Sequence, residues 1–330
     1  MPTLIFPLDK AAAFLGCFCS GFERYERSLR WQAGDGTSEL RVEAGEWRTF
    51  DGLVVREVVT LTHAAPMFGD VPPADMAKLN AWSTLSAFVP AGPSGPARLV
   101  AKIGIFDGDH AAAECIYAPL LSTEAAVVAW HASQLMRGRF QTKPSDSPLS
   151  VVDREPPYQQ ADFEAAKAIT DRSGFLSTVG SRHFTVEFPW DADAVSKMFT
   201  IDEARGNATQ DAQFTSDQRK QMGGAASLLQ IRVARHPFYG PGIHCMLELP
   251  LPAEGDGAAE LVTGLNAWEL SYPDLPPHLG AWSLGERAPT YVCFLPTQYA
   301  LPGLLQNLTV WMAARAARTR ALFQRQAATQ

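Results

Sequence analysis

The run Asp107-Gly108-Asp109-His110 comes closest to a chemical signature in this chain. Two carboxylates and an imidazole within four residues could bind a metal ion or transfer a proton. Asp-Gly is also a favoured turn dipeptide, and the run follows a strand pattern over residues 99–106. The matching place in the second half, residues 296–298, has no carboxylate. We therefore predict a turn here, with Asp107, Asp109 and His110 kept as the alternative metal ligands.

Other catalytic signatures are missing from the sequence. It contains no glycine-rich phosphate loop, no Gly-x-Ser-x-Gly elbow and no His-Glu-x-x-His motif. The seven histidines show no ligand spacing, and His131, beside Trp130, is predicted to be a half-buried packing residue. We therefore assign no catalytic residue, no cofactor-binding residue and no cofactor, and we expect the protein not to be an enzyme.

An internal repeat gives the clearest indication of the fold. Leu79-Asn80-Ala81-Trp82 recurs as residues 265–268, and strand patterns precede and follow both copies in the same order. Each copy ends in a helical pattern that carries a tryptophan, Trp130 in the first and Trp311 in the second. A tryptophan buries a large apolar area. We therefore predict four structural anchors in the core: Trp82, Trp268, Trp130 and Trp311.

The two repeated asparagines, Asn80 and Asn266, admit two interpretations. They could act as catalytic amides. Asparagine is also favoured at the C-terminal ends of helices, so we predict that they end short helices over residues 74–79 and 258–265.

The predicted fold class is α+β, with two tandem units that form a pseudo-dimer. Each unit has a helix, three strands, a short helix, two or three strands and a long helix, so each sheet is antiparallel with helices packed on one face. The units cover residues 1–140 and 161–330, joined by a Pro- and Ser-containing linker at 141–160. Residues 191–226 form an insertion where the first unit has only residues 33–38.

Composition and charge narrow the class of protein further. Among 330 residues, 28 basic and 35 acidic side chains give a net charge of −7, which argues against nucleic acid as a partner. The arginines of the last helix, Arg315, Arg318 and Arg320, fit a solvated helix end, where the macrodipole favours cations; a nucleic-acid patch is the alternative. No apolar run approaches the roughly 18 residues of a membrane helix. Five scattered cysteines and an N-terminal amphipathic helix, with Phe14 and Phe18 on its apolar side, favour a cytoplasmic protein.

The segment from Leu79 through the strand at residues 101–106 to the helix around Trp130 resembles the YbjN-like proteins, which share the fold of type III secretion chaperones. The resemblance covers about residues 28–137 and, more faintly, 183–320. It implies an acidic, non-enzymatic, partner-binding protein of the kind that works as a homodimer. This chain is about twice as long, so its two units would stand for the two subunits, and its insertion has no counterpart.

The predicted function is therefore that of a bacterial-type adaptor or chaperone-like protein that binds another protein, through the insertion or the junction between the units. The alternative is an enzyme or a small-molecule or metal-binding protein with a site near the inter-unit cleft. A third hypothesis is an accessory subunit of one fixed complex.

Overall fold

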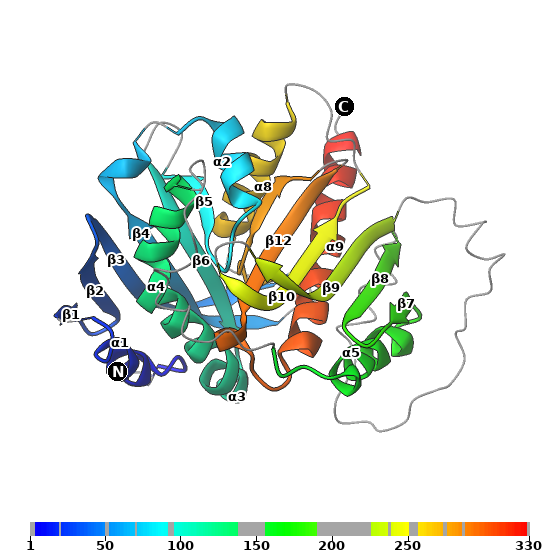
Figure 1. The fold of residues 1–330 in the computed structure, drawn as a ribbon, viewed down its shortest axis with the longest axis horizontal. Helices are drawn as coiled ribbons and strands as arrows, with labels where there is room; N and C mark the ends of the chain where they lie inside the picture. The colour runs from blue at the N-terminus through cyan, green and yellow to red at the C-terminus, as the bar shows by residue number, and fades with distance from the viewer. Residues whose placement is uncertain are drawn as a thin grey trace.

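A computed structural model describes residues 4–19, 21–49, 53–69, 71–91, 96–137, 156–189, 226–236, 239–250, 257–272, 276–285 and 288–328. Two six-stranded antiparallel sheets with helices make up this part of the chain (Figure 1). The α+β class and the two tandem units are as predicted. The predicted insertion at 191–226 and most of the linker at 141–160 lie outside the described residues.

The first unit begins with helix α1 (Leu8–Leu15) and ends with α4 (Ala118–Arg137). Its sheet has the order β1-β2-β3-β4-β6-β5. These strands are β1 (Phe22–Arg24), β2 (Ser28–Ala33), β3 (Gly36–Arg48), β4 (Val54–Ala64), β5 (Ala87–Pro90) and β6 (Ala97–Phe106). The helical turn η1 (Pro66–Phe68) and helix α2 (Pro73–Asn80) connect β4 to β5, and α3 (His110–Ala112) and the π-helical turn η2 (Ala113–Tyr117) lead into α4.

The second unit repeats this arrangement, from α5 (Gln160–Arg172) to α9 (Leu304–Ala328), with the sheet order β7-β8-β9-β10-β12-β11. Its strands are β7 (Leu176–Val179), β8 (His183–Pro189), β9 (Ala226–His236), β10 (Gly240–Glu248), β11 (Ala281–Leu284) and β12 (Pro289–Pro296). Helix α8 (Ala258–Ser271) takes the place of α2, and the turn η4 (Thr297–Tyr299) precedes α9.

The strand register of the two sheets matches residue by residue. Across the first sheet, Ser28, Arg41, Thr60 and Lys102 stand opposite one another in consecutive strands. The same row of the second sheet is His183, Arg232, His244 and Phe294. A backbone bond is repeated as well, because the N–H of Val42 donates to Arg27 and that of Val233 donates to Arg182. Identical order and register support the predicted duplication.

Each unit has four strands before its middle helix, not the three that were predicted. The additional strands, β1 and β7, are short edge strands of three and four residues, none of which is fully buried. Their sequences therefore lack the alternation of apolar and polar residues that indicates a strand. Strand β2 and the first parts of β3 and β9 alternate buried and more exposed positions, whereas β6 and β12 are buried along most of their length.

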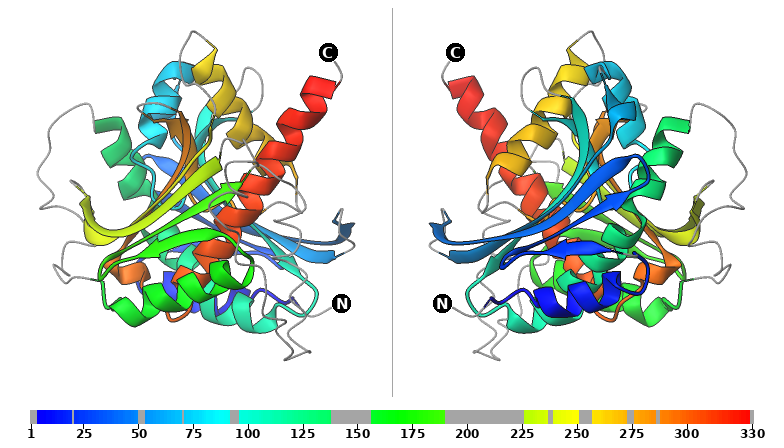
Figure 2. Two further views of the ribbon diagram at one scale, coloured as in Figure 1. Left: turned by 90° about the vertical axis from the view of Figure 1, so that its right-hand side faces the viewer. Right: turned by 90° about the vertical axis from the view of Figure 1, so that its left-hand side faces the viewer.

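Helix α4 packs on the first sheet, and α9 crosses the second sheet diagonally in Figure 2. One hydrophobic cluster runs through both units, and the rings of Tyr117 and Trp311 meet 5.8 Å apart where α9 approaches the start of α4. Helices α2 and α8 lie side by side at one end of the molecule (Figures 1 and 2). The two units therefore form one body with a shared core.

The segment His110–Ser133 is, by length and composition, one described helical stretch that could cross a membrane; more than half of its most apolar window is buried inside the protein. Helix α1 differs from its prediction. It buries Leu8, Ala11 and Leu15, whereas Phe14 and Phe18 are exposed, because the face that meets α4 follows the i, i+3, i+7 positions that start at Leu8.

Candidate functional site

The repeated asparagines hold the junction between helix and sheet in the same way in both units. The side chain of Asn80 donates to the carbonyl of Phe88 at 3.0 Å and accepts from its N–H at 2.7 Å. Asn266 makes the same pair of bonds with Trp282, at 2.9 and 2.8 Å. Both amides are buried, and their backbone partners occupy equivalent sheet positions. The geometry is that of a structural clamp.

The positions of the asparagines along their helices differ. Asn80 is the last residue of α2, as predicted, but α8 continues for five residues beyond Asn266. The predicted helix end at residue 265 is therefore wrong. The reason lies in the connection to the next strand, because 16 residues separate Asn266 from its partner Trp282 and only eight separate Asn80 from Phe88.

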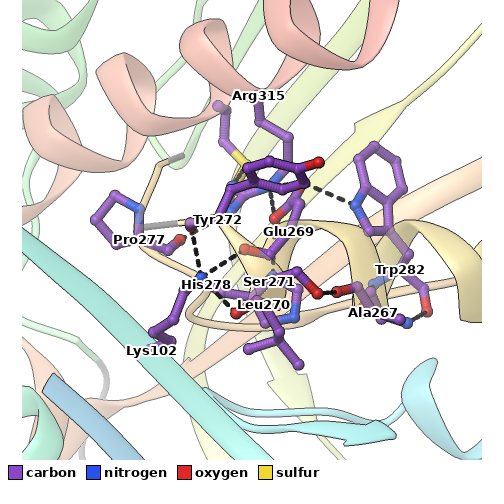
Figure 3. Close-up of polar contacts among 12 residues, drawn as sticks. Lys102, Ala267, Glu269, Leu270, Ser271, Tyr272, Pro277, His278, Trp282 and Arg315 are labelled. Carbon is purple, nitrogen blue, oxygen red and sulfur yellow. Dashed lines mark hydrogen bonds and ion pairs between the residues drawn. The ribbon is translucent and has the colours of Figure 1, made fainter. Parts of the chain in front are cut away.

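The longer connection in the second unit encloses a buried ionic cluster centred on Glu269 (Figure 3). Nε of Arg315 donates to both carboxylate oxygens, at 2.9 and 3.0 Å. The indole N–H of Trp282 donates to the same carboxylate at 2.9 Å, and Nδ1 of His278 lies 2.8 Å from it. The guanidinium of Arg315 also covers the ring of Tyr291 at 3.6 Å and donates to the carbonyl of Pro277. We call Glu269, His278, Trp282 and Arg315 the Glu269 cluster.

The first unit contributes a cation beside this cluster. Nζ of Lys102, on β6, donates to the carbonyls of Glu269, Leu270 and Tyr272 at 2.6–2.7 Å. These carbonyls belong to the C-terminal end of α8, where a positive charge is favoured. The backbones of Lys102 and His278 also exchange two hydrogen bonds. A buried lysine of one unit therefore holds the helix end of the other.

The charges of the Glu269 cluster are fixed by their partners. Burial raises the pKa of the Glu269 carboxyl, but the charge of Arg315 and the bonds from His278 and Trp282 outweigh burial and hold this pKa at about 2. Burial lowers the pKa of His278 more than its carboxylate partner raises it. At neutral pH the cluster therefore contains an ionised glutamate and a charged arginine, a state suited to structure and unsuited to proton transfer.

A second buried polar cluster surrounds Glu124 of α4 and also includes residues of both units. Its carboxylate accepts from Ser86 at 2.8 Å and from Tyr299 of the second unit at 2.7 Å. Nδ1 of His131 lies 3.2 Å from Glu124 and 3.0 Å from Thr84. Although burial raises the pKa of Glu124, the contacts with His131, Tyr299 and Ser86 lower it below its usual value. The prediction of His131 as a half-buried packing residue is wrong, because it is fully buried in this cluster.

The run Asp107-Gly108-Asp109-His110 forms the predicted turn at the end of β6, with Gly108 at a positive φ of 95°. Asp107 is exposed and forms an ion pair with Arg56, with 3.0 Å between the guanidinium nitrogen and the carboxylate oxygen. Burial raises the pKa of Asp109. Across the described residues, no three His, Cys, Asp or Glu side chains come together in a group that could hold a metal ion.

The tryptophan anchors have unequal burial. Trp311 is buried, and Trp130 and Trp268 are half-buried. Trp82 is 44% exposed, so its prediction as a core anchor is wrong. Its helix ends two residues earlier at Asn80, and the ring projects beyond the helix, whereas Trp268 remains inside α8.

Trp82 is instead the exposed ring of an aromatic cluster shared by the two units, in which His236 is half-buried and Tyr239 is buried. Its ring meets His236 edge-on at 5.4 Å, and His236 stacks on Tyr239 at 4.4 Å. Trp130 of the first unit contacts Tyr239 at 5.4 Å. Burial first, and then the neighbouring histidines, hold the pKa of His236 at about 3, so its ring is neutral at physiological pH. We call Trp82, His236 and Tyr239 the junction shelf.

The predicted solvated helix end of α9 is wrong for Arg315, which lies on the face that covers Tyr291 and pairs with Glu269. Sequence reasoning also missed Glu124, Glu269 and Lys102 as buried charges. A signal existed in the sequence, because each interrupts a largely apolar stretch that forms a helix or a strand. Charges in such places are buried only with partners.

Comparison of the chain with protein-family models, with curated proteins and with solved structures found no match in any of the three.

Proposed function

We propose that this chain is a non-enzymatic, protein-binding adaptor or chaperone-like protein of the cytoplasm, and that it binds its partner at the junction shelf. The observation that carries the proposal is the exposure of Trp82, 44% open to solvent on a shelf built by both units. Exposed aromatic residues on a rigid support are typical of the centres of protein interfaces. The resemblance to YbjN-like proteins, whose relatives act as homodimers, supports the same function.

The buried clusters favour binding over catalysis. The carboxylates of Glu124 and Glu269 are buried, and each has several hydrogen-bond partners from other parts of the fold, such as Tyr299 for Glu124 and Arg315 for Glu269. A general acid or base must come within hydrogen-bond reach of a substrate. The Glu124 carboxylate instead joins the two units through Tyr299, and the backbone carbonyl of Glu269, rather than its carboxylate, accepts the bond from Lys102 across the junction.

The test is an affinity capture from native cell extract with the purified chain as bait. Wild type and Trp82→Ser are compared, with Tyr272→Ser as the matched control, because Tyr272 is also an exposed aromatic residue, at 51%. The proposal expects a stoichiometric partner that wild type and Tyr272→Ser retain and Trp82→Ser loses. Equal retention by all three proteins would remove the junction shelf from the interface, and no retained partner would contradict the adaptor function.

The enzyme alternative has its own test at the turn. The purified chain is analysed for metal and titrated with Mg²⁺, Mn²⁺ and Zn²⁺, before and after the combined changes Asp107→Ala and Asp109→Ala. We expect no stoichiometric binding, because Asp107 is exposed and already paired with Arg56. Metal that binds the wild type and is lost in the double variant would replace the adaptor proposal with a metal-dependent function.

A further inference from the structure

The two sheets have the same register but carry different charges on their exposed faces. In the first unit, Arg30 of β2 pairs with Glu39 at 3.6 Å, and Arg41 of β3 pairs with Glu43 at 3.1 Å. The arginines of this face are therefore neutralised by glutamates of the same sheet.

The second unit keeps an arginine but not the glutamates. Register places Arg232 of β9 at the position of Arg41, and Gln230 and Ala234 at the positions of Glu39 and Glu43. Arg232 is exposed, and the glutamates that flank Arg41 on its strand have no counterparts at these two positions beside Arg232. The second sheet thus has one arginine and neither acid at the positions where the first sheet has two arginines and two glutamates, with Thr185 in the place of Arg30.

Arg232 lies in an open hollow on this face. The hollow is lined by Arg182, by the start of β8 and by the middle of β9, with Arg182, His183, Thr185 and Gln230 as the polar residues beside Arg232. Arg182 and His183 are exposed as well. His244, on β10, stands opposite Arg232. Burial, and then the charge of Arg232, holds the pKa of His244 at about 4, so His244 adds no charge at neutral pH. The exposed guanidinium of Arg232 therefore provides a positive charge in the hollow.

The hollow leads toward the junction shelf. Arg232 stands opposite His244, and His244 stands opposite Phe294, along one row of the second sheet. The ring of Phe294 contacts His236 at 4.9 Å, and His236 contacts Trp82. The row therefore runs from the exposed Arg232 through His244 to the buried Phe294, whose ring contacts the junction shelf.

We propose that the hollow around Arg232 binds the carboxylate side chains of an acidic segment of the partner protein. This inference rests on the proposed function and adds the chemistry of the bound segment. The guanidinium group presents a fork of N–H donors that matches a carboxylate. The hollow is open and lies on a sheet face, whereas a small-molecule site encloses most of its ligand, so a side chain of a larger partner fits better. The chain as a whole carries a net charge of −7, so a positively charged hollow is a local exception on it. The positive charge orients an acidic partner toward the hollow.

The test measures fluorescence polarisation of a fluorescein-labelled peptide of alternating glutamate and serine, titrated with the full chain. Binding is expected to weaken between about 50 and 300 mM salt, since exposed charges are screened. Arg232→Gln should bind about fivefold more weakly, the upper range for one exposed ion pair. Restoring the acids of the first unit, with Gln230→Glu and Ala234→Glu together, should weaken binding at least as much.

The matched control is Arg41→Gln, which removes the equivalent arginine from the neutralised face and should leave peptide binding unchanged. Equal loss in Arg41→Gln and Arg232→Gln, or unchanged binding after Gln230→Glu with Ala234→Glu, would overturn the inference. Competition by inorganic phosphate at concentrations where acetate is inert would also overturn it, by assigning the hollow to phosphorylated ligands.

The outcome separates this inference from the adaptor function. A partner retained in the affinity capture by both wild type and Arg232→Gln, together with no peptide binding, would overturn the acidic segment alone. Peptide binding with the expected pattern of variants, but no captured partner at all, would overturn the adaptor function and leave the carboxylate site.

Discussion

Replacing Arg315 by methionine should expose how strongly the Glu269 cluster couples the last helix to the second sheet. The change keeps a long apolar side chain but removes both hydrogen bonds from Nε to Glu269 and the bond to the carbonyl of Pro277. It leaves a carboxylate that is only 1% exposed without its cation. Breaking a buried pair on one side costs about 3–5 kcal/mol of unfolding free energy.

The pKa of Glu269 reflects the net effect of burial and of all its partners, Arg315 first among them. Its folded-state pKa of about 2 lies below its usual 4.5, which corresponds to about 3 kcal/mol of stabilisation of the ionised form. A lowered pKa gives stability that is complete above pH 4.5 and is lost as the pH falls toward 2. Without Arg315 the burial that opposes ionisation remains, so Arg315→Met should cost about 3–5 kcal/mol at neutral pH.

The assay is urea unfolding at pH 7 and pH 4 of wild type, Arg315→Met, Glu269→Gln and the double variant. We expect the double variant to lose at least about 2 kcal/mol less than the sum of the single changes, because each single change leaves one buried group unpaired. Arg41→Met, at an exposed pair, is the control and should cost under about 0.5 kcal/mol. Additive losses within about 0.5 kcal/mol would refute the coupling.

Three further predictions concern stability. Asn80→Ala and Asn266→Ala should each cost about 2–4 kcal/mol in urea unfolding, because each removes two buried hydrogen bonds and leaves backbone groups unpaired; a loss below about 1 kcal/mol would contradict the clamp. Trp311→Ala should cost about 3–5 kcal/mol and Trp82→Ala under about 2, in proportion to their burial, and the reverse order in thermal melts would contradict the assignment of Trp82 to the surface. Burial holds the pKa of His63 at about 4, so wild-type stability should fall as the pH drops from 6.5 toward 4, and His63→Asn should flatten that slope; parallel curves would refute this.

The order of the elements could be predicted from the sequence because it depends on local patterns. The repeated Leu-Asn-Ala-Trp segments and the helices around Trp130 and Trp311 place equivalent elements in the right sequence, and apolar alternation indicates the long strands. The edge strands β1 and β7 have no such pattern, since neither of their faces is deeply buried. Their place follows from pairing with β2 and β8, which no local window contains.

The buried charges could not be predicted for a different reason. Arg315 has the sequence context of a solvated helix end, and its true environment is set by Glu269, which lies 46 residues away. His131 likewise meets Thr84 across 47 residues. A single sequence shows which charges interrupt apolar stretches but not which partner will satisfy each one. The exposure of Trp82 depends on the end of α2 two residues earlier, and helix ends are the least certain part of any pattern.

The junction also explains why the two units belong to one chain. Lys102 of the first unit corresponds to Phe294 of the second, and Thr84 corresponds to His278. The carbonyls that receive Lys102 come from the end of α8, which extends beyond its clamp asparagine, whereas α2 ends at Asn80. Two copies of the first unit would therefore bring two buried lysines to a junction that lacks this helix end, and unpaired buried charges are strongly unfavourable. Covalent duplication lets the two sides of the junction differ. The same divergence, on the exposed face, leaves Arg232 without a counterpart of Glu43, which pairs with Arg41.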